Sequence, residues 1–283
     1  MTLRELRTLF IQNLRDLYEE EEILVFFYLA TEKWLHKSKV QYLLNIDNKI
    51  TKKDQDLFGR LIEKLKKEEP IQYILGETFF YDYIFKVNTN VLIPRPETEE
   101  LVRWVIKDYS AETTFPLSIL DIGTGSGCIA ISLAKRLNKA TVSAIDISEE
   151  AIILAKCNAK IHNQNVQWIQ QDVLTMDALP AKYDIIVSNP PYVRNSEKKE
   201  MKNNVLNYEP GLALFVDDKN PLLFYKKIAE LGLGNLANNG SLYFEINQYL
   251  GNETLLLMEQ LGYRNLSLKK DIFGNDRFIK AVK

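Results

Sequence analysis

One tetrapeptide, Asn189-Pro190-Pro191-Tyr192, carries the side chains best suited to chemistry. The Asn189 side-chain oxygen and the Pro190 carbonyl can each accept one N–H of a planar nitrogen group, and Tyr192 can pack on its flat face. An amide or aromatic amine nitrogen is a poor nucleophile because its lone pair is delocalised. The tetrapeptide therefore predicts a site that aligns such a nitrogen for attack on an electrophile, without a strong general base. Its combination of residues weighs against a merely rigid proline turn.

A glycine-rich turn indicates where a cofactor binds. Residues 119–127 read as a strand, a glycine turn and the start of a helix. Glycine lacks a Cβ and accepts positive φ, so the backbone can approach a ligand closely. A dinucleotide-binding loop would have its third glycine at Cys128. The spacing instead resembles the first motif of class I methyltransferases, which cradles the amino-acid part of S-adenosylmethionine. The predicted cofactor-binding residues here are Gly123, Thr124, Gly125, Ser126 and Gly127.

Carboxylates after later strands extend this prediction. Asp146 lies 23 residues beyond Gly123, near the place where a doubly wound fold puts its ribose carboxylate. A carboxylate only accepts hydrogen bonds, which suits a vicinal diol, whereas Ser148 is better placed to cap the next helix. Asp172 is predicted either to accept from the adenine amino group or to form a turn. We add Val173 and Asn189 to the predicted cofactor contacts.

The elements that must position these residues form an α/β pattern from residue 118 onward. Alternating strands and helices predict a mainly parallel, doubly wound sheet with helices on both faces. The predicted strands are residues 118–121, 141–145, 166–170, 184–188 and 241–246, with two more near residues 267 and 278. The predicted helices are residues 129–137, 149–162, 221–236 and 252–261.

The first 75 residues have a different character. Leu3, Leu6, Phe10, Leu14 and Leu17 step at helical spacing, and further apolar stretches at residues 23–35 and 57–65 complete a predicted helical bundle. Aromatic and β-branched residues then predict a small β-hairpin. We therefore expect an N-terminal helical substrate-recognition domain (1–75), a β-hairpin linker (76–95) and a methyltransferase domain (96–283), with a helix starting at Pro96.

Composition narrows the class of protein. The chain has 283 residues and a formal net charge of −2. Residues 1–75 hold 13 basic and 13 acidic side chains, which makes direct nucleic-acid binding unlikely as the main function because such binding uses many Lys and Arg contacts to phosphate. Two cysteines and two histidines without metal-ligand spacing predict no metal site. A charged N-terminus and the lack of a long apolar run predict a cytoplasmic protein that does not enter a membrane.

Over nearly its whole length, the chain resembles the bacterial-type peptide chain release factor glutamine methyltransferases. Besides the glycine loop and the tetrapeptide, the matching motifs are Gln72-Tyr73-Ile74-Leu75-Gly76, Leu92-Ile93-Pro94-Arg95-Pro96-Glu97-Thr98-Glu99, Tyr208-Glu209-Pro210, and Asp271, Gly274 and Asp276-Arg277. The Pro-Arg-Pro-Glu-Thr-Glu run is the specific part, since Asn-Pro-Pro-Tyr also occurs in DNA adenine and rRNA methyltransferases. The family often has glycine where this chain has Asn247, and a larger apolar residue than Val173.

The resemblance implies methyl transfer from S-adenosylmethionine to the glutamine of the Gly-Gly-Gln loop in class I release factors. The glycine loop and Asp146 would bind the cofactor, and Asn189 to Tyr192 would bind the glutamine, while the helical domain would grip the factor. Two alternatives remain: an adenine or guanine amino-methyltransferase acting on a flipped base of a nucleic acid, and a non-catalytic cofactor-binding adaptor. Residues 194–202 are interpreted as a solvated loop that could also cover the substrate.

Overall fold

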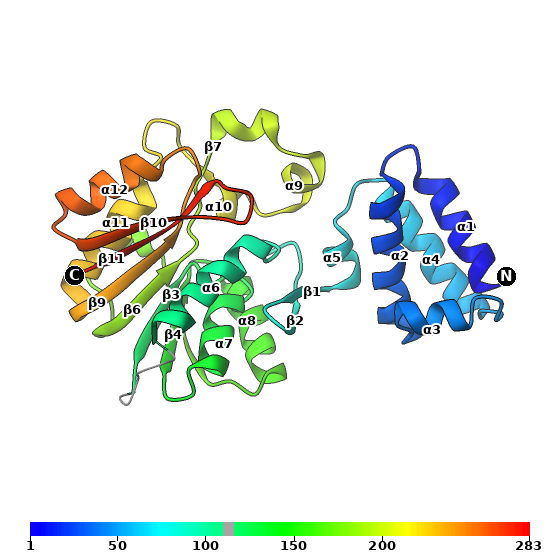
Figure 1. Cartoon of the computed structure of the whole chain (residues 1–283), viewed down its shortest axis with the longest axis horizontal. Coiled ribbons are helices and arrows are strands. Elements are labelled where there is room, and N and C mark those ends of the chain that lie inside the picture. Colours follow the sequence, from blue (N-terminus) through cyan, green and yellow to red (C-terminus); the bar gives the residue numbers. More distant parts are fainter. Residues whose placement is uncertain (110–115) are drawn as a thin grey trace. The chain divides into compact units, whose positions relative to one another are not determined.

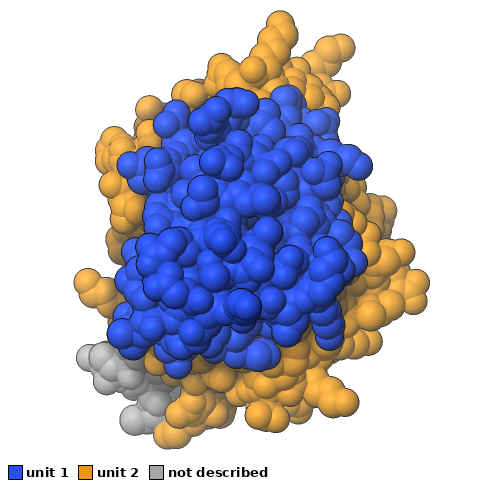
Figure 2. Space-filling view, turned by 90° about the vertical axis from the view of Figure 1, so that its right-hand side faces the viewer, with its two compact units in different colours: residues 1–76, 202–208 blue, residues 77–201, 209–283 orange. Residues whose placement is uncertain are grey.

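A computed structural model of the chain describes residues 1–109 and 116–283. These residues form two compact units, coloured separately in Figure 2. The first contains residues 1–76 and 202–208, and the second contains residues 77–201 and 209–283. Whether residues 1–75 fold and act as a separate domain stays a prediction. No helix in the described part of the chain is long and apolar enough to cross a membrane.

Helices make up the first unit (Figure 1). They are α1 (Leu3–Leu14), α2 (Glu20–Leu35), α3 (Lys39–Leu44), α4 (Lys52–Leu65) and α5 (Ile71–Leu75). The helical patterns predicted α1, α2 and α4, whereas α3 and α5 are too short to show a periodic apolar face. Helix α1 ends before Leu17, which is exposed, because the Leu17 and Tyr18 N–H groups both bind the Leu14 carbonyl and close a turn. The prediction that Leu17 continues the buried stripe was wrong.

Aromatic packing holds this unit together. Phe10, Phe27 and Phe58 are fully buried, and their ring centroids lie 5.5 to 6.2 Å apart. Each ring removes a large apolar surface from water, and tilted or edge-on contacts add to that burial. Capping boxes at Thr2, Ser38 and Thr51 start α1, α3 and α4 by satisfying N–H groups that have no partner within the helix.

A distant segment of the chain also belongs to the first unit. It contains the short helix α9 (Asn203–Tyr208). The Tyr208 hydroxyl donates to the Lys67 carbonyl at 2.8 Å, and the Asn203 side-chain amide donates to the Glu68 carboxylate at 3.1 Å. The first unit is therefore completed by residues that follow the fourth strand of the main sheet of the second unit.

That sheet has seven strands, in the order β10-β11-β9-β6-β3-β4-β5. Strands β3, β4, β5, β6 and β9 run parallel, and β11 pairs antiparallel with both β9 and β10. Their bounds are β3 (Ser118–Ile122), β4 (Thr141–Asp146), β5 (Val166–Gln170), β6 (Tyr183–Ser188), β9 (Leu236–Glu245), β10 (Arg264–Lys270) and β11 (Asp276–Val282). The predicted doubly wound sheet is confirmed, although Leu236, predicted to end a helix, begins β9 instead.

Helices cover both faces of the sheet (Figure 1). One apolar core forms against α6 (Pro96–Tyr109), α7 (Cys128–Arg136) and α8 (Glu149–Ile161), and the other against α11 (Leu223–Asn235) and α12 (Gly251–Gln260). In β3, Ile119 belongs to the first core and Leu120 to the second, as expected for a strand buried on both faces. Along the sequence, β4 and β5 are added one after the other on one side of β3, whereas β6 is added on the other side of β3.

Shorter elements complete the second unit. They are the antiparallel hairpin β1 (Glu77–Phe80) and β2 (Tyr83–Lys86), the single turns η1 (Val173–Thr175), η2 (Asn195–Glu200) and α10 (Gly211–Leu214), and the parallel pair β7 (Val193–Arg194) and β8 (Phe215–Val216). The predicted hairpin is confirmed. Because β7 pairs with β8, the two ends of the segment 195–214, which contains α9, lie side by side.

One buried side chain connects the hairpin to the glycine loop. Asn158 on α8 is fully buried and accepts from the Lys86 N–H at 2.7 Å. Its amide also donates to the carbonyls of Lys86 and Ser126 at 3.0 and 2.8 Å. Three backbone groups, two at the end of β2 and one in the glycine loop, therefore depend on one amide.

Replacing Asn158 with alanine should destabilise the protein by about 2 kcal/mol or more, because buried backbone groups would lose their partners. Urea unfolding of the full chain measures this loss. The exposed Lys156 on the same helix supplies a control, since Lys156→Ala should change the free energy of unfolding by less than about 0.5 kcal/mol. Equal, small effects of the two substitutions would contradict the bridging role of Asn158.

Candidate active site

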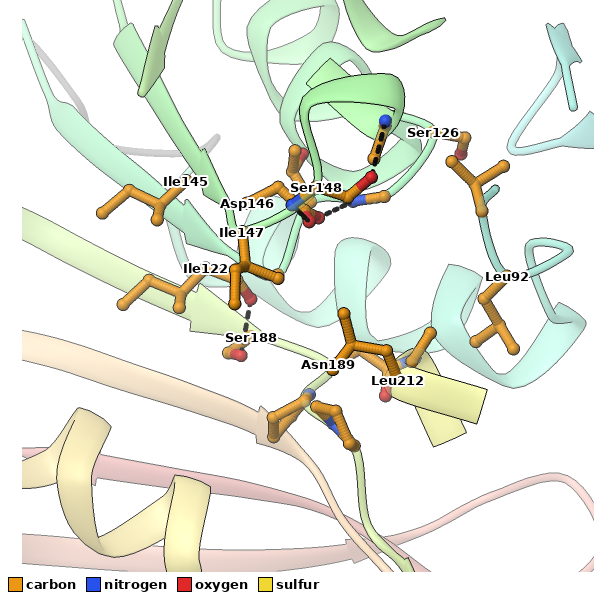
Figure 3. A pocket seen from close by; sticks show the side chains of 18 of the residues that line it. Leu92, Ile122, Ser126, Ile145, Asp146, Ile147, Ser148, Ser188, Asn189 and Leu212 are labelled. Atoms are coloured by element: carbon orange, nitrogen blue, oxygen red, sulfur yellow. Dashed lines mark hydrogen bonds between the residues drawn. The ribbon is translucent and has the colours of Figure 1, made fainter. Parts of the chain in front are cut away.

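A pocket of about 350 Å³ opens where the parallel strands end, within the second unit. Figure 3 shows labelled side chains from several elements gathered around it. The pocket lies where the strand order reverses around β3, which is where open α/β sheets bind ligands. Its lining is largely apolar with a few polar groups, and its volume suits a small organic molecule.

The structure brings most of the predicted site residues together. Ten of them line this one pocket: Gly123, Thr124, Gly125, Ser126, Asp146, Asp172, Val173, Asn189, Pro190 and Pro191. Two do not line it, Gly127 and Tyr192. The chemical roles assigned to all twelve residues stay predictions.

The glycine loop follows β3 and is held by its neighbour β4. Both the Gly123 and the Thr124 N–H donate to the Ile145 carbonyl, at 2.9 and 3.0 Å. Gly123 and Gly125 have φ values of +76° and +53°, a region that side-chain-bearing residues seldom adopt. A Cβ on Gly125 would meet no atom within 4 Å. Gly125 thus leaves an open backbone surface on the pocket wall.

Gly127 serves packing. Its φ is +80°, and a Cβ there would lie 3.0 to 3.2 Å from the side chains of Ile131, Ala155 and Trp168. That spacing is tighter than van der Waals contact allows without movement of these neighbours. The third glycine of the motif therefore lets α7 pack against α8 and β5.

Asp146 links the glycine loop to the next helix. Its carboxylate accepts from the Gly125 N–H at 2.8 Å and from the Ser148 N–H at 3.0 Å. Burial raises the pKa of Asp146, and these two backbone donors oppose the increase. Ser148 caps α8 by accepting from the Ala151 N–H at 3.1 Å, as the sequence indicated. Each Asp146 oxygen keeps a second lone pair for a ligand.

Asp172 and its neighbours line the pocket just after the end of β5. The Asp172 carboxylate accepts from the Leu174 N–H at 2.9 Å and so caps η1, which is the turn role that was weighed against adenine binding. Val173 and Ile147 also line the pocket, and Ile147 is 45% exposed. Ile147 was not predicted as a pocket residue, although its position directly after Asp146 could have indicated that it lies in the pocket.

The amide of Asn189 is oriented by a neighbouring hydroxyl. Its Nδ2 donates to the Thr98 Oγ1 at 3.2 Å. Thr98 is buried and its hydroxyl donates to the Glu245 Oε2 at 2.6 Å. With Nδ2 engaged, the Asn189 Oδ1 is the end left to accept from a substrate. Thr98 lies within one of the motifs that match the family, but no role was predicted for it.

Tyr192 contacts the same carboxylate. Its hydroxyl donates to the Glu245 Oε1 at 3.0 Å, and burial raises the pKa of this phenol well above its ordinary value. Tyr192 therefore stays neutral, and its hydroxyl is directed at Glu245. Its side chain packs against the core on the α11 and α12 side of the sheet. The predicted packing of Tyr192 on a substrate amide remains untested.

Two further carboxylates that the sequence left without a role shape the pocket. Glu209 accepts from the Arg95 guanidinium at 2.6 Å and from the Ile93 N–H at 3.1 Å, which ties two lining segments together. Asp121 accepts from the Thr124 hydroxyl at 2.6 Å and from the Ala130 N–H at 3.2 Å. Burial raises the pKa of Asp121 to about 7. Glu209 belongs to a motif that matches the family and Asp121 comes directly before the glycine loop, but their function depends on contacts that sequence spacing does not reveal.

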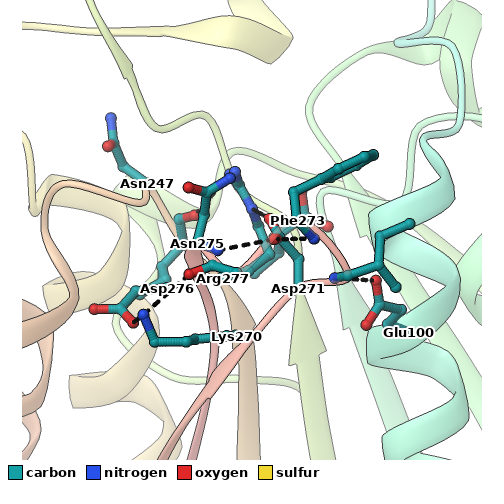
Figure 4. A network of polar contacts seen from close by, with 12 residues as sticks. Glu100, Asn247, Lys270, Asp271, Phe273, Asn275, Asp276 and Arg277 are labelled. Atoms are coloured by element: carbon teal, nitrogen blue, oxygen red, sulfur yellow. Dashed lines mark hydrogen bonds and ion pairs between the residues drawn. The ribbon is translucent and has the colours of Figure 1, made fainter.

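A network at the β10–β11 turn supports the end of β9 (Figure 4). The Asp271 carboxylate accepts from the N–H groups of Phe273 and Asn275 and from the Arg277 Nε at 3.1 Å. Arg277 also donates to the Ile246 carbonyl at 3.2 Å. The charge of Arg277 is thereby held next to Glu245, whose carboxylate form it favours.

At Asn247 the chain departs from the family that it resembles, and this side chain is fully engaged in hydrogen bonds. Its amide donates to the Tyr192 carbonyl at 3.0 Å and to the Glu197 carboxylate at 2.9 Å, while Arg194 pairs with Glu197 at 2.9 Å. Residues 194–197 are thus anchored directly after the tetrapeptide. Within residues 1–109 and 116–283, no group of three or more His, Cys, Asp and Glu side chains could hold a metal ion.

Known proteins with similar sequences agree on one family. Residues 108–208 match the family model "Methyltransferase small domain", and residues 5–76 match "PrmC N-terminal domain". A release factor glutamine methyltransferase of Flavobacterium psychrophilum is 52% identical over 99% of each chain. One of Bacteroides thetaiotaomicron is 46% identical and covers 95% of this chain and 96% of its own.

A solved structure shares the fold. The second unit's architecture is similar to a 16S rRNA methyltransferase of T. thermophilus in complex with AdoMet and guanosine, with a TM-score of 0.54 and 17% identity. That likeness covers 73% of this chain and 49% of the other. It bears on the fold alone.

The second and third glycines of the loop offer a matched pair of substitutions. Gly127→Ala should destabilise the protein by about 2 kcal/mol or more, because it adds a crowded Cβ at a positive φ. Gly125→Ala should cost about 1 kcal/mol but weaken binding of the predicted cofactor, S-adenosylmethionine, because the new methyl group would project into the pocket. Urea unfolding and calorimetric titration measure the two quantities. Lost affinity at unchanged stability in Gly127→Ala would make Gly127 a ligand contact.

Proposed function

The chain belongs to the release factor glutamine methyltransferase family, and we propose that it transfers a methyl group from S-adenosylmethionine to the side-chain amide nitrogen of a glutamine in a release factor. The finer proposal is that the factors are class I peptide chain release factors and that the glutamine is the one in their Gly-Gly-Gln loop. The observation that carries the chemistry is the position of Asn189 and Pro190 on the wall of the pocket that the glycine loop also lines.

Three features support S-adenosylmethionine as the methyl donor. The open backbone at Gly125 leaves room for the amino-acid part of the molecule. The Asp146 carboxylate has acceptor capacity for the ribose hydroxyls, and Ile147 and Val173 offer apolar surfaces for the adenine ring. When bound there, S-adenosylmethionine supplies a methyl group on a positively charged sulfur, which becomes a neutral thioether as the glutamine nitrogen gains the methyl group and loses one proton.

The residues of this chain would act by positioning. The Asn189 Oδ1 and the Pro190 carbonyl each accept one N–H of the glutamine amide, which fixes the nitrogen and increases its electron density. A Cβ built on Gly123 would lie 3.9 Å from the Asn189 carbonyl oxygen, so the two loops are neighbours. Apolar lining from Leu212 and Phe224 suits the methylene stem of the glutamine and limits access of water.

In this mechanism no carboxylate acts as a base toward the substrate. Among the described residues, the two carboxylates that line the pocket are Asp146 at the end of β4 and Asp172 after β5, and both strands lie beyond β3 as seen from β6. Glu245, which contacts Tyr192, does not line the pocket, and both of its oxygens already accept hydrogen bonds. The proton of the methylated nitrogen therefore leaves to solvent. Positioning and electrostatics supply the catalytic contribution.

We further infer that residues 1–75 form the surface that recognises the release factor. This unit exposes large apolar side chains on α3, where Val40, Leu43 and Leu44 are 51 to 79% exposed. Exposed apolar groups of this kind are common at protein–protein interfaces. Its balanced charge does not favour nucleic acid as the partner.

A methyl-transfer assay with labelled S-adenosylmethionine tests the proposed function. The substrates are a purified class I release factor, the same factor with the loop glutamine replaced by alanine, and duplex DNA. We expect label on the native factor and none on the alanine variant or on DNA. Label on DNA alone would replace the proposal with a base methyltransferase. Cofactor binding without any transfer would identify an adaptor protein instead.

Two substitutions separate the roles of the two loops. Asn189→Ala should reduce the transfer rate on the order of 100-fold with the affinity for S-adenosylmethionine largely preserved, because the glutamine loses an acceptor while the glycine loop and Asp146 still hold the cofactor. Asp146→Ala should weaken cofactor binding first. Single-turnover rates and calorimetric titration provide the two readouts. An equal loss of both quantities in Asn189→Ala would remove its assigned role, and unchanged cofactor affinity in Asp146→Ala would refute the ribose contact.

A further inference from the structure

The strongest unexplained feature next to the tetrapeptide is a fully buried carboxylate. Glu245 ends β9 and is 1% exposed. Burying a charged group is costly unless hydrogen bonds compensate for lost water. Both Glu245 oxygens are engaged: Oε2 accepts from the Thr98 hydroxyl at 2.6 Å, and Oε1 accepts from the Tyr192 hydroxyl at 3.0 Å. The proposed reaction itself assigns no task to this carboxylate.

We propose that Glu245 is a positioning residue that, acting through Thr98, fixes which end of the Asn189 side-chain amide faces the substrate. This inference rests on the proposed function, because it assigns the Asn189 Oδ1 to the glutamine N–H. It assigns a role to two residues: Glu245, which does not line the pocket, and Thr98, which does.

The first step follows from what each group can donate. A carboxylate only accepts hydrogen bonds, whereas a hydroxyl has one proton and can also accept. Because Glu245 takes the proton of Thr98, the Thr98 oxygen has only acceptor capacity left for Asn189. The Asn189 NH₂ group, 3.2 Å away, satisfies that acceptor.

The second step excludes the flipped amide. An asparagine side chain has nearly the same shape after a 180° rotation, so packing alone selects poorly between its two orientations. In the flipped state, the Asn189 Oδ1 would face the Thr98 oxygen with no proton between them. The Asn189 NH₂ would then meet the NH₂ of a glutamine substrate, and two donors repel. The buried carboxylate therefore selects the orientation that can hold the substrate.

The third step concerns the charge of Glu245. Burial raises the pKa of this carboxyl, but the two hydroxyl donors and the nearby Arg277 guanidinium all favour its ionised form. Arg277 is itself held by Asp271 and by the Ile246 carbonyl. The network of Figure 4 holds Arg277 in place, and the charge of Arg277 opposes the effect of burial by favouring the form of Glu245 that can only accept.

Substitutions at Thr98 test this assignment with a matched pair. Thr98→Val keeps the shape of the side chain but removes the hydroxyl, so kcat should fall on the order of 10- to 100-fold through misorientation of Asn189. The affinity for S-adenosylmethionine should not change. Thr98→Ser keeps the hydroxyl and should retain nearly the full rate. Glu245→Gln introduces a donor that lets Thr98 reverse its hydrogen bond, so kcat should fall here too. Equal rates for the valine and serine variants would overturn the assignment.

A double-mutant cycle separates orientation from simple loss of structure. In an Asn189→Ala background, Thr98→Val should cause no further loss of rate, because the amide it orients is gone. A loss of the same size in both backgrounds would show that Thr98 only supports the fold, and this would overturn the proposal.

A measurement without catalysis keeps the proposal separate from the proposed function. The side-chain NH₂ resonances of Asn189, assigned by their disappearance in Asn189→Ala, report its hydrogen bond to Thr98. They should shift in Thr98→Val and in Glu245→Gln but not in Thr98→Ser. Resonances that are unchanged in all three variants would contradict the relay, which is the hydrogen-bonded chain from Glu245 through Thr98 to Asn189. If the resonances shift as expected but the enzyme labels no release factor, the proposed function is wrong and the relay still stands.

Discussion

The parallel pairing of β3 with β6 is the constraint on which the site depends. The chain reverses its strand order around β3, so the loop after β3 and the loop after β6 leave the same edge of the sheet as neighbours. A direct hydrogen bond from the Ser188 hydroxyl to the Ile122 carbonyl, at 2.7 Å, fixes the two strand ends to each other. A glycine turn and a proline-rich tetrapeptide 66 residues apart in sequence are thereby held next to each other in the lining of one small pocket, and neither loop could form the site alone.

Carboxylates that are buried or half-buried give this edge its rigidity. Asp121, Asp146, Glu209 and Glu245 each accept two hydrogen bonds from other residues. An acceptor with two oxygens can join two loops that lack regular secondary structure, provided that donors compensate for its lost hydration. The catalytic contribution proposed for this protein is accurate placement of a weak nucleophile, and such placement requires a frame of this kind more than it requires a reactive side chain.

The sequence predicted the strands, the main helices and the two loops on which the pocket is built, because these depend on local patterns. Alternation of apolar segments reveals a parallel sheet, and glycine or proline next to a strand end reveals a loop that carries function. The Glu245–Thr98–Asn189 relay escaped prediction because Thr98 and Glu245 are 147 residues apart, and no local pattern records which hydroxyl meets which carboxylate. Gly127 shows the converse case, in which a local motif predicted too much. From its place in the motif it was predicted to contact a ligand, whereas its close neighbours explain the glycine by packing.

Helix α9 has a consequence for how the protein is made. Residues 202–208 complete the first unit, yet the ribosome adds them only after β3, β4, β5 and β6 have been synthesised. The leading five helices thus emerge early without the Tyr208–Lys67 and Asn203–Glu68 contacts, and the unit closes only when a much later stretch of chain returns to it. A gene fragment that stops at residue 76 would encode an unfinished bundle, and the natural boundary between the two units is not a single cut in the sequence.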